Sequence, residues 1–231
     1  MRVIGLIGGM SWESSVEYYR IINEEVKRRL GGLHSAKCLL YSVDFHEIER
    51  YQSEGAWEKA GEVLGNAARS LEKGGADFIV ICTNTMHKVI GDIQSKINIP
   101  LLHIADATAT QIQEKGINSV GLLGTRYTME QDFYKSRLEL NGIQVIVPND
   151  NDREIVNKVI YEELCLGKIH QESREYYKKV IEGLIKFGAK GIILGCTEIG
   201  LLVKPEDSDV PIFDTTYIHA FEAVNMSLNR V

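Results

Sequence analysis

The sequence predicts an α/β protein made of two similar lobes, each a parallel sheet flanked by helices, with the lobes related by pseudo-twofold symmetry. The main observation is a repeat. Gly75–Thr85 (GADFIVICTNT) aligns with Gly188–Glu198 (GAKGIILGCTE), and each copy reads as a glycine stop, a buried strand and a small polar turn. A second repeat, in the same order, aligns Val3–Gly8 with Ser119–Gly124. Any parallel sheet repeats strand, glycine and helix, but here the polar turn is repeated too, which favours duplication.

The first lobe is predicted over residues 1–105, together with a closing helix over 215–231. Its first helix begins near Ser11, a good N-cap, and the glycine pair at 31–32 ends it. Alternating strands and helices imply a parallel sheet with helices on both faces. The predicted elements are strand 3–7, helix 11–29, strand 36–43, a polar segment over 47–54, helix 57–73, the strand of the repeat, helix 86–96 and strand 99–104.

The second lobe is predicted over residues 106–214 and follows the same plan. No low-complexity linker separates the two lobes, so we expect them to be tightly joined. The predicted elements are a bridging helix 106–115, strand 119–123, helix 128–141, strand 143–147, helices 152–166 and 172–187, strand 190–195, strand 210–213 and the closing helix, whose pattern runs over 215–229.

The composition is that of an ordinary globular protein: 231 residues, 44% hydrophobic and 25% charged, with a net charge of −6. No long basic run is present, which argues against nucleic acid or an anionic membrane as partner. The N-terminal apolar run reads as a strand rather than a signal peptide, and no stretch approaches a membrane span, so a cytoplasmic location is expected. The cysteines lack zinc-ligand spacing and should be thiols: Cys38, Cys82, Cys165 and Cys196.

Both repeated turns should lie at the carboxyl ends of strands, where open α/β sheets bind ligands. They should also lie at helix N-termini, where backbone N–H groups favour an anion. Asn84, Thr85 and Thr197 add side-chain donors, so a substrate carboxylate is a natural ligand. Alternatively, Asn84 and Thr197 only cap helices.

Cys196 is the best candidate for a base or nucleophile, because a thiol at a helix N-terminus can have a lowered pKa. Its alternative is a buried structural cysteine. Thr83 aligns with Cys196, and an acid and a base on opposite sides of one carbon are what inversion of configuration needs. Cys82 lies one residue earlier than Thr83 and should face the core. His87 either tunes the Thr83 turn or is a satisfied helix residue.

Two turn motifs give the chain a family resemblance. They are Thr83-Asn84-Thr85-Met86-His87 and Gly195-Cys196-Thr197-Glu198, and they resemble the C-N-T-x-H and G-C-T-E turns of the aspartate/glutamate racemases. Most members carry cysteine at both turns, and the threonine at the first is similar to the branch specific for L-aspartate and L-glutamate. The resemblance runs end to end through the blocks GLIGGMSWESS, LGGLHSA, SVDFHEIE, CTNTMHK, LHIADAT, LLGTRYTMEQDFY, EELCLG, GCTEIGLLV and FDTT.

The resemblance implies racemisation of acidic amino acids by two bases, without PLP, metal or other cofactor, in a homodimer with the active site between the lobes. It implies that Cys196 acts on one face of the α-carbon and Thr83 on the other. The implied substrate contacts are Met10, Gln52, Asn84, Thr85 and Thr197, with Thr125 and Thr128 as weaker candidates. Arg126 or Lys168 could meet the side-chain carboxylate.

Two alternatives stay open. One is a broad-specificity racemase acting on neutral or basic amino acids, which a panel of L-amino acids in deuterated water would reveal. The other is a binding protein that holds an acidic ligand without turnover, because a threonine hydroxyl is a weak acid. Tight binding without exchange of the α-proton would favour the second alternative.

Overall fold

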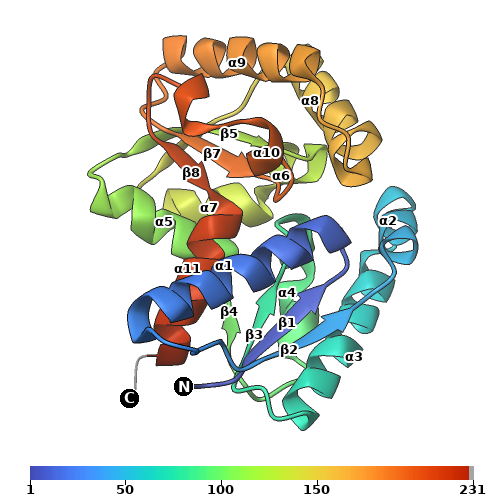
Figure 1. The fold of residues 1–231 in the computed structure, drawn as a ribbon. Coiled ribbons are helices and arrows are strands. Elements are labelled where there is room, and N and C mark those ends of the chain that lie inside the picture. Colours follow the sequence, from blue (N-terminus) through green and yellow to red (C-terminus); the bar gives the residue numbers. More distant parts are fainter. Residues whose placement is uncertain (229–231) are drawn as a thin grey trace. The chain divides into compact units, whose positions relative to one another are not determined.

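The computed structural model describes residues 1–228, so the last residue of the predicted closing helix, Asn229, lies outside the described residues. The chain divides into two compact units: Met1–His103 together with the segment from His219 onward, and Ile104–Ile218. Each unit holds one four-stranded parallel sheet with helices packed against it (Figure 1). The predicted class, two parallel α/β sheets flanked by helices, is confirmed.

The sheet of the first unit has the strand order β2-β1-β3-β4, with β2 at one edge. Its strands are β1 (Ile4–Gly8), β2 (Cys38–Ser42), β3 (Phe78–Ile81) and β4 (Leu101–Leu102). Its helices are α1 (Trp12–Leu30), α2 (Phe45–Ser53), α3 (Trp57–Lys73), the 3-10 helix η1 (Thr85–Val89) and α4 (Ile90–Gln94). The C-terminal helix α11 (Thr215–Leu228) begins in the second unit and ends in the first.

Alternate residues of β3 face two separate apolar clusters. Phe78 and Val80 pack with α1 and α11, whereas Ile79 and Ile81 pack with α2, α3 and α4. Every side chain of β3 is therefore buried, as expected for a strand covered on both faces. Cys82, directly after the strand, is fully buried in the cluster with α1 and α11, which confirms the prediction that it faces the core.

The sheet of the second unit has the equivalent order, β6-β5-β7-β8. Its strands are β5 (Ser119–Gly124), β6 (Gln144–Ile146), β7 (Ile192–Gly195) and β8 (Ile212–Asp214). Its helices are α5 (Ile104–Glu114), α6 (Arg126–Glu130), α7 (Asp132–Leu140), α8 (Asp150–Glu162), α9 (Gln171–Lys186) and α10 (Ile199–Leu202), with 3-10 helices η2 (Leu164–Leu166) and η3 (Pro205–Asp207). Identical strand orders agree with the duplication that the repeats predict.

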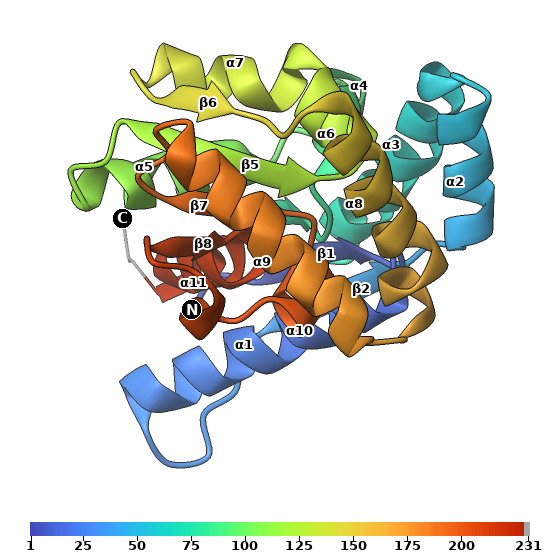
Figure 2. The ribbon, with the colours of Figure 1, turned by 90° about the horizontal axis from the view of Figure 1, so that it is seen from above.

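The second sheet is also covered on both faces. Ile192 and Leu194 of β7 pack with α8 and α9, while Ile193 packs with α5 and α7. In Figure 2, α9 crosses in front of this sheet. The two repeated strands, β3 and β7, thus occupy the same place in their sheets and are buried on both faces.

Several predicted elements are wrong in detail. The polar segment over 47–54 is part of a helix, α2, because Asp44 caps it and Ile48 and Gln52 bury one face. The predicted helix 128–141 is two helices, since Gln131 has extended backbone (φ −92, ψ 157) between them. The predicted helix 86–96 is the 3-10 helix η1 followed by α4. The strand predicted over 99–104 has only two residues, because α5 begins at Ile104.

Candidate active site

The repeated turns follow β3 and β7 directly. In the first unit, the Cys82 N–H donates to the Ile7 carbonyl (2.9 Å) and the Thr83 N–H donates to the Ile81 carbonyl (2.9 Å), so the chain turns sharply as soon as the strand ends. Thr83 itself is half-buried. In the second unit, Cys196 follows β7 in the same position. Both turns are therefore at the carboxyl end of a buried parallel strand, where ligands bind in such sheets.

The helices directly after these turns are short. The first turn leads into η1, which has five residues, and the second into α10, which has four. A helix of about one turn sums few peptide dipoles, so the predicted macrodipole at each turn is small. The two predicted caps are absent: Asn84 makes no side-chain cap bond to η1, and the Thr197 hydroxyl donates to the Glu198 carboxylate.

Three residues with implied substrate roles lie around the first turn, within the first unit. Met10 and Met86 belong to the apolar cluster on the α2–α4 side of the sheet. The Gln52 amide Nε2 donates to the Met86 sulfur (3.0 Å), which brings α2 against η1. Asn84 and Thr85 follow Thr83 and are buried. The structure therefore gathers Gln52, Asn84 and Thr85 near one turn, although Met10 and Gln52 also serve the packing of the core.

The second turn holds a thiol and a carboxylate in contact. Cys196 Sγ donates to Glu198 Oε2 (2.9 Å), and the Thr197 hydroxyl donates to the same oxygen (2.8 Å). All three side chains are buried, with Glu198 2% exposed. A buried carboxylate that accepts two hydrogen bonds is compensated for part of its lost hydration. The arrangement gives the thiol an immediate acceptor for its proton.

The pKa of Cys196 is raised well above its ordinary value, first by burial and then by the negative charge of Glu198. The prediction that this pKa is lowered is therefore wrong. A lowered pKa needs an electropositive site, and the turn instead places a carboxylate beside the sulfur and only a four-residue helix behind it. Cys196 rests as a thiol.

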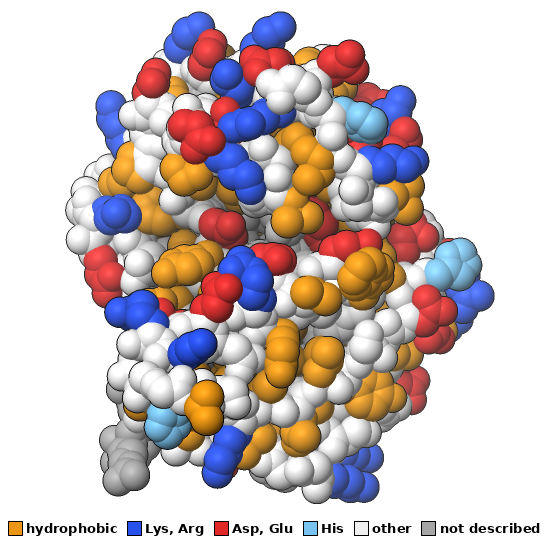
Figure 3. Space-filling view, in the orientation of Figure 1, with side chains coloured by type: hydrophobic (Ala, Val, Ile, Leu, Met, Phe, Trp, Pro, Cys, Tyr) orange, Lys and Arg blue, Asp and Glu red, His pale blue; other side chains and the backbone are white. Residues whose placement is uncertain are grey.

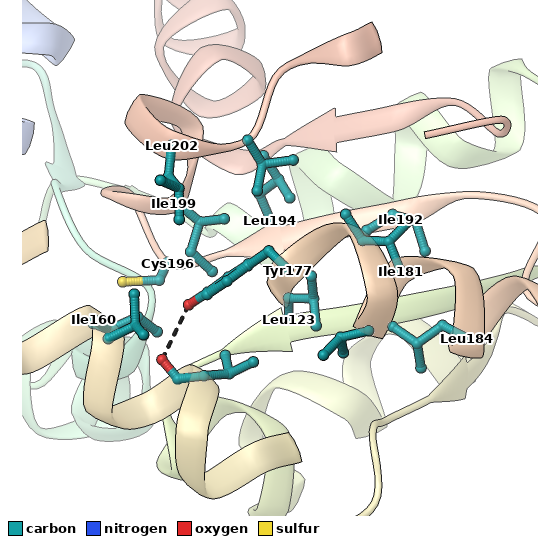
Figure 4. Packing of buried hydrophobic residues seen from close by; sticks show 14 of the residues in the cluster. Leu123, Ile160, Tyr177, Ile181, Leu184, Ile192, Leu194, Cys196, Ile199 and Leu202 are labelled. Carbon is teal, nitrogen blue, oxygen red and sulfur yellow. Dashed lines mark hydrogen bonds between the residues drawn. The ribbon is translucent and has the colours of Figure 1, made fainter. Parts of the chain in front are cut away.

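Apolar side chains pack around Cys196. Cys196 belongs to the cluster between the second sheet and helices α8, α9 and α10, with Ile160, Tyr177 and Ile199 nearby (Figure 4). Tyr177 is held in place by a hydrogen bond from its hydroxyl to the Val156 carbonyl (3.0 Å). Low polarity around the thiol and carboxylate strengthens their interaction and excludes water.

The weaker candidates lie in the loop after β5. The Thr125 side chain caps α6 and lies 3.2 Å from the Thr128 hydroxyl. Gly124 approaches β7 so closely that a Cβ on it would lie 2.9 Å from the Gly195 carbonyl oxygen, so this loop borders the Cys196 turn. Arg126 forms an ion pair with Glu130 (3.2 Å), with which an acidic substrate would compete, and Lys168 is exposed.

Sequence reasoning gave no role to Glu198. The available signal was an acidic residue two positions after a candidate cysteine, in a turn short enough for the side chains to meet. Within residues 1–228, no group of three His, Cys, Asp or Glu side chains is arranged to hold a metal ion. No helix in this range is long and apolar enough to cross a membrane.

The site thus consists of a buried thiol hydrogen-bonded to a buried carboxylate, on one of two α/β units with equivalent strand orders. Residues 7–223 match the Asp/Glu/Hydantoin racemase family, and the chain belongs to this family.

Three similar proteins illustrate the match. The chain is 29% identical to the broad specificity amino-acid racemase RacX of Bacillus subtilis (strain 168), over 98% of each chain. It is 61% identical to a structure from Yersinia pestis provisionally described as an Asp/Glu racemase, covering 99% of this chain and 100% of that one, with a TM-score of 0.92. It is 36% identical to an aspartate racemase homologue from Pyrococcus horikoshii OT3, with the same coverage and a TM-score of 0.84.

Proposed function

We propose that this protein interconverts the enantiomers of acidic amino acids, aspartate and glutamate, without PLP. The observation that carries the proposal is the contact between the Cys196 thiol and the buried Glu198 carboxylate. It stands at the turn whose repeat carries Thr83. A racemase needs an acid and a base that reach the α-carbon from opposite faces, and the repeat supplies one residue for each.

In one direction Cys196 removes the α-proton. Its own proton first passes to Glu198 Oε2, which leaves a thiolate at the position of the sulfur. The α C–H bond then breaks, its proton goes to sulfur, and its electron pair stays on carbon. The Thr83 hydroxyl delivers a proton to the opposite face, and exchange with solvent returns a proton to Thr83 and removes one from Glu198. In the other direction the Cys196 thiol is the donor.

The substrate carboxylates need donors, and several are available near the turns. We propose Asn84, Thr85 and Thr197, with the backbone N–H groups of their turns, as donors to the substrate α-carboxylate. Met10 and Gln52 are proposed as further substrate contacts, since Gln52 packs against Met86 in the same motif as Thr83. Arg126 or Lys168 is proposed for the side-chain carboxylate, because a guanidinium or an ammonium group can form a charge-assisted hydrogen bond with it.

A second candidate function is racemisation of a wider range of amino acids. It is favoured by the 29% identity, over nearly the full length of both chains, to a broad specificity amino-acid racemase. The two candidates share the chemistry at the α-carbon and differ in the pocket for the side chain.

Proton NMR of L-amino acids in deuterated water, with enzyme free of metal and PLP, tests both candidates. Loss of the α-proton signal and of optical activity for L-aspartate or L-glutamate is the expected result. Loss with neutral or basic amino acids as well would establish the broad specificity. Absence of exchange with every amino acid, despite tight binding of an acidic one, would contradict catalysis and support a binding protein.

We also propose a homodimer that forms through an apolar face of the first unit. Its members are exposed although they are hydrophobic: Trp12, Val16, Tyr19 and Leu40 are 65%, 52%, 53% and 50% exposed. They lie on α1 and the edge strand β2, where Figure 3 has hydrophobic side chains at the surface. These four residues, together with Cys38, line a hollow of about 380 Å³. A second copy would cover both the apolar patch and the strand edge.

The dimer is tested by light scattering after chromatography. Val16→Glu should convert a wild-type dimer to a monomer, whereas Glu24→Gln on the polar side of the same helix should leave the mass unchanged. A wild-type monomer at micromolar concentration would contradict the dimer. A cytoplasmic location is proposed as well, since Cys38, Cys82 and Cys196 are free thiols.

A further inference from the structure

The first unit contains a buried group of three imidazoles and one phenol, which we call the imidazole cluster: Tyr18, His87, His103 and His219. None of the four is more than 4% exposed. Tyr18 comes from α1, His87 from η1, His103 follows β4, and His219 comes from α11. Neither proposed acid–base partner belongs to the cluster, yet His87 lies four residues after Thr83.

Two backbone carbonyls fix the tautomers in the imidazole cluster, because a carbonyl can only accept. His219 Nε2 lies 3.0 Å from the Leu102 carbonyl oxygen, so Nε2 carries the proton and Nδ1 accepts from the Tyr18 hydroxyl at 2.8 Å. Burial lowers the pKa of His219 to about 3, which keeps its imidazole neutral in this arrangement. His87 Nδ1 lies 2.9 Å from the Thr83 carbonyl oxygen, so Nδ1 is the donor there.

The ring of His87 packs against two other rings. Its centroid lies 4.6 Å from that of His103, with the planes tilted by 53°, and 5.6 Å from that of His219 in an edge-on arrangement. His219 is in turn fixed edge-on to Tyr18, with centroids 5.7 Å apart. A buried side chain locked by packing and a defined hydrogen bond can hold its partner to a few tenths of an ångström.

We propose that His87 is a positioning residue for Thr83, and that the imidazole cluster holds the His87 ring so that its Nδ1–H fixes the Thr83 carbonyl. The Thr83 N–H is already held by the Ile81 carbonyl at 2.9 Å. With both backbone groups of Thr83 fixed, the turn sets the direction of the Cα–Cβ bond that carries its hydroxyl. This inference rests on the proposed racemisation, and it explains why a weak acid such as threonine is placed so rigidly.

The test needs a readout that reports each face of the α-carbon separately. Each α-enantiomer of 3-chloroglutamate provides one. Loss of the α-proton leaves an electron pair that forms a double bond as the C–Cl bond breaks and chloride leaves, and hydrolysis of the enamine gives a keto acid and ammonia. Elimination needs only one base. The elimination rate of each enantiomer therefore reports the base on the face that carries its α-proton. Thr83→Ala and Cys196→Ala identify which enantiomer belongs to which residue.

The variants are chosen to separate positioning from stability. His87→Asn keeps an N–H close to the Nδ1 position, whereas His87→Gln places it near Nε2, and both are polar. His87→Gln should slow elimination from the Thr83-dependent enantiomer about 10–100-fold, the usual cost of misplacing a reacting group by about an ångström. His87→Asn should recover most of that rate. Val26→Ala, which cuts the buried core of the same unit, should change both enantiomers equally.

Equal loss for both enantiomers in His87→Gln, or equal rates in His87→Asn and His87→Gln, would overturn the positioning role. The proposed function fails in a different way. If wild-type enzyme eliminates chloride from neither enantiomer and exchanges no α-proton, the racemisation is wrong and the inference falls with it. Thr83→Ala and Cys196→Ala could each abolish elimination from one enantiomer while His87→Gln slows elimination from neither. In that case only the inference is overturned.

Discussion

The turns after β3 and β7 occupy equivalent places in equivalent sheets, but they are held by different means. At the first turn, the Thr83 carbonyl accepts from a side chain, the imidazole of His87. At the second, the Cys196 carbonyl accepts from the backbone N–H of Ile199 (3.1 Å). The residue four positions on is His87 in one repeat and Gly200 in the other. The two turns therefore share their place in the sheets and differ in the groups that hold them.

The difference extends to what each turn can do chemically. The second turn places the carboxylate of Glu198 in contact with the Cys196 thiol. The first turn instead has His87, a member of the imidazole cluster, whose Nδ1–H donates to the Thr83 carbonyl. A thiol with a carboxylate beside it is suited to proton transfer, while a threonine hydroxyl gains most from accurate placement. The four predictions below test this division, from the largest expected effect to the smallest.

Removing the thiol should have the largest effect. Cys196→Ala should lower racemisation and α-proton exchange by about 10²–10⁴-fold, the usual contribution of one acid–base group. Exchange followed by NMR in deuterated water measures it. Thr83→Cys is the matched change at the other turn and should bring the kcat values of the two directions closer together. The values of kcat/KM for the L-to-D and D-to-L directions must stay equal, because the two enantiomers have equal free energy. Retained activity in Cys196→Ala would contradict the proposed mechanism.

Acid should destabilise the first unit through His219. Its pKa of about 3 in the folded protein lies below the ordinary value of 6.5, so the unfolded chain binds more protons between these two values. Stability is therefore full above pH 6.5 and falls as the pH drops towards 3. Between pH 7 and pH 4 the loss should be about 3 kcal/mol from this group alone.

Both tryptophans, Trp12 and Trp57, lie in the first unit, so urea unfolding followed by their fluorescence reports that unit. His219→Gln should flatten the dependence on pH, although it lowers stability at pH 7 by removing the Nδ1 acceptor of the Tyr18 hydroxyl. His170→Gln in the second unit is the control, because His170 is exposed. An unchanged slope in His219→Gln would show that another group governs the acid response.

The charge of Glu198 should control both the acidity of Cys196 and the rate. Glu198→Gln removes a negative charge that raises the Cys196 pKa, so this pKa should fall towards its ordinary value. The loss of the proton acceptor should still lower kcat about tenfold or more. Thiolate absorbance against pH, with Glu198→Gln/Cys196→Ala subtracted, measures the pKa. Glu182→Gln on α9 is a control for the loss of one carboxylate. A rise in the Cys196 pKa would contradict the expected effect of the charge.

The position equivalent to His87 should not accept a side chain in the second unit. A Cβ on Gly200 would lie 2.5 Å from Asp214 Oδ2, and Asp214 is held because its other oxygen accepts from the Thr216 N–H (2.9 Å). Gly200→Ala should therefore cost about 1–3 kcal/mol. Gly183→Ala in α9, where no atom beyond the helix's own backbone lies within 4 Å of the new Cβ, should instead stabilise by about 0.5–1 kcal/mol. Thermal unfolding compares the two variants, and equal melting temperatures would contradict the clash.

Much of the fold follows from the sequence because burial on both faces leaves a plain signal. β3 and β7 are continuous apolar runs after a glycine, and α3 ends where its amphipathic pattern ends, at Lys73. Helix boundaries were predicted less well where local geometry overrides the pattern. Gln131 interrupts an amphipathic run by adopting extended backbone, and Asp44 starts a helix in a segment that reads as polar.

The sequence by itself determined the duplicated α/β plan, the position of Thr83 and Cys196 at equivalent turns, and the burial of Cys82. These features depend on periodicity and local order, which a linear chain records directly. Tertiary structure decided that the Cys196 pKa is raised and that Glu198 contacts the sulfur. It also decided that His219 and Tyr18, 201 positions apart, meet at 2.8 Å. The physical reason is that pKa values and side-chain contacts depend on distance and burial, which only the folded chain defines.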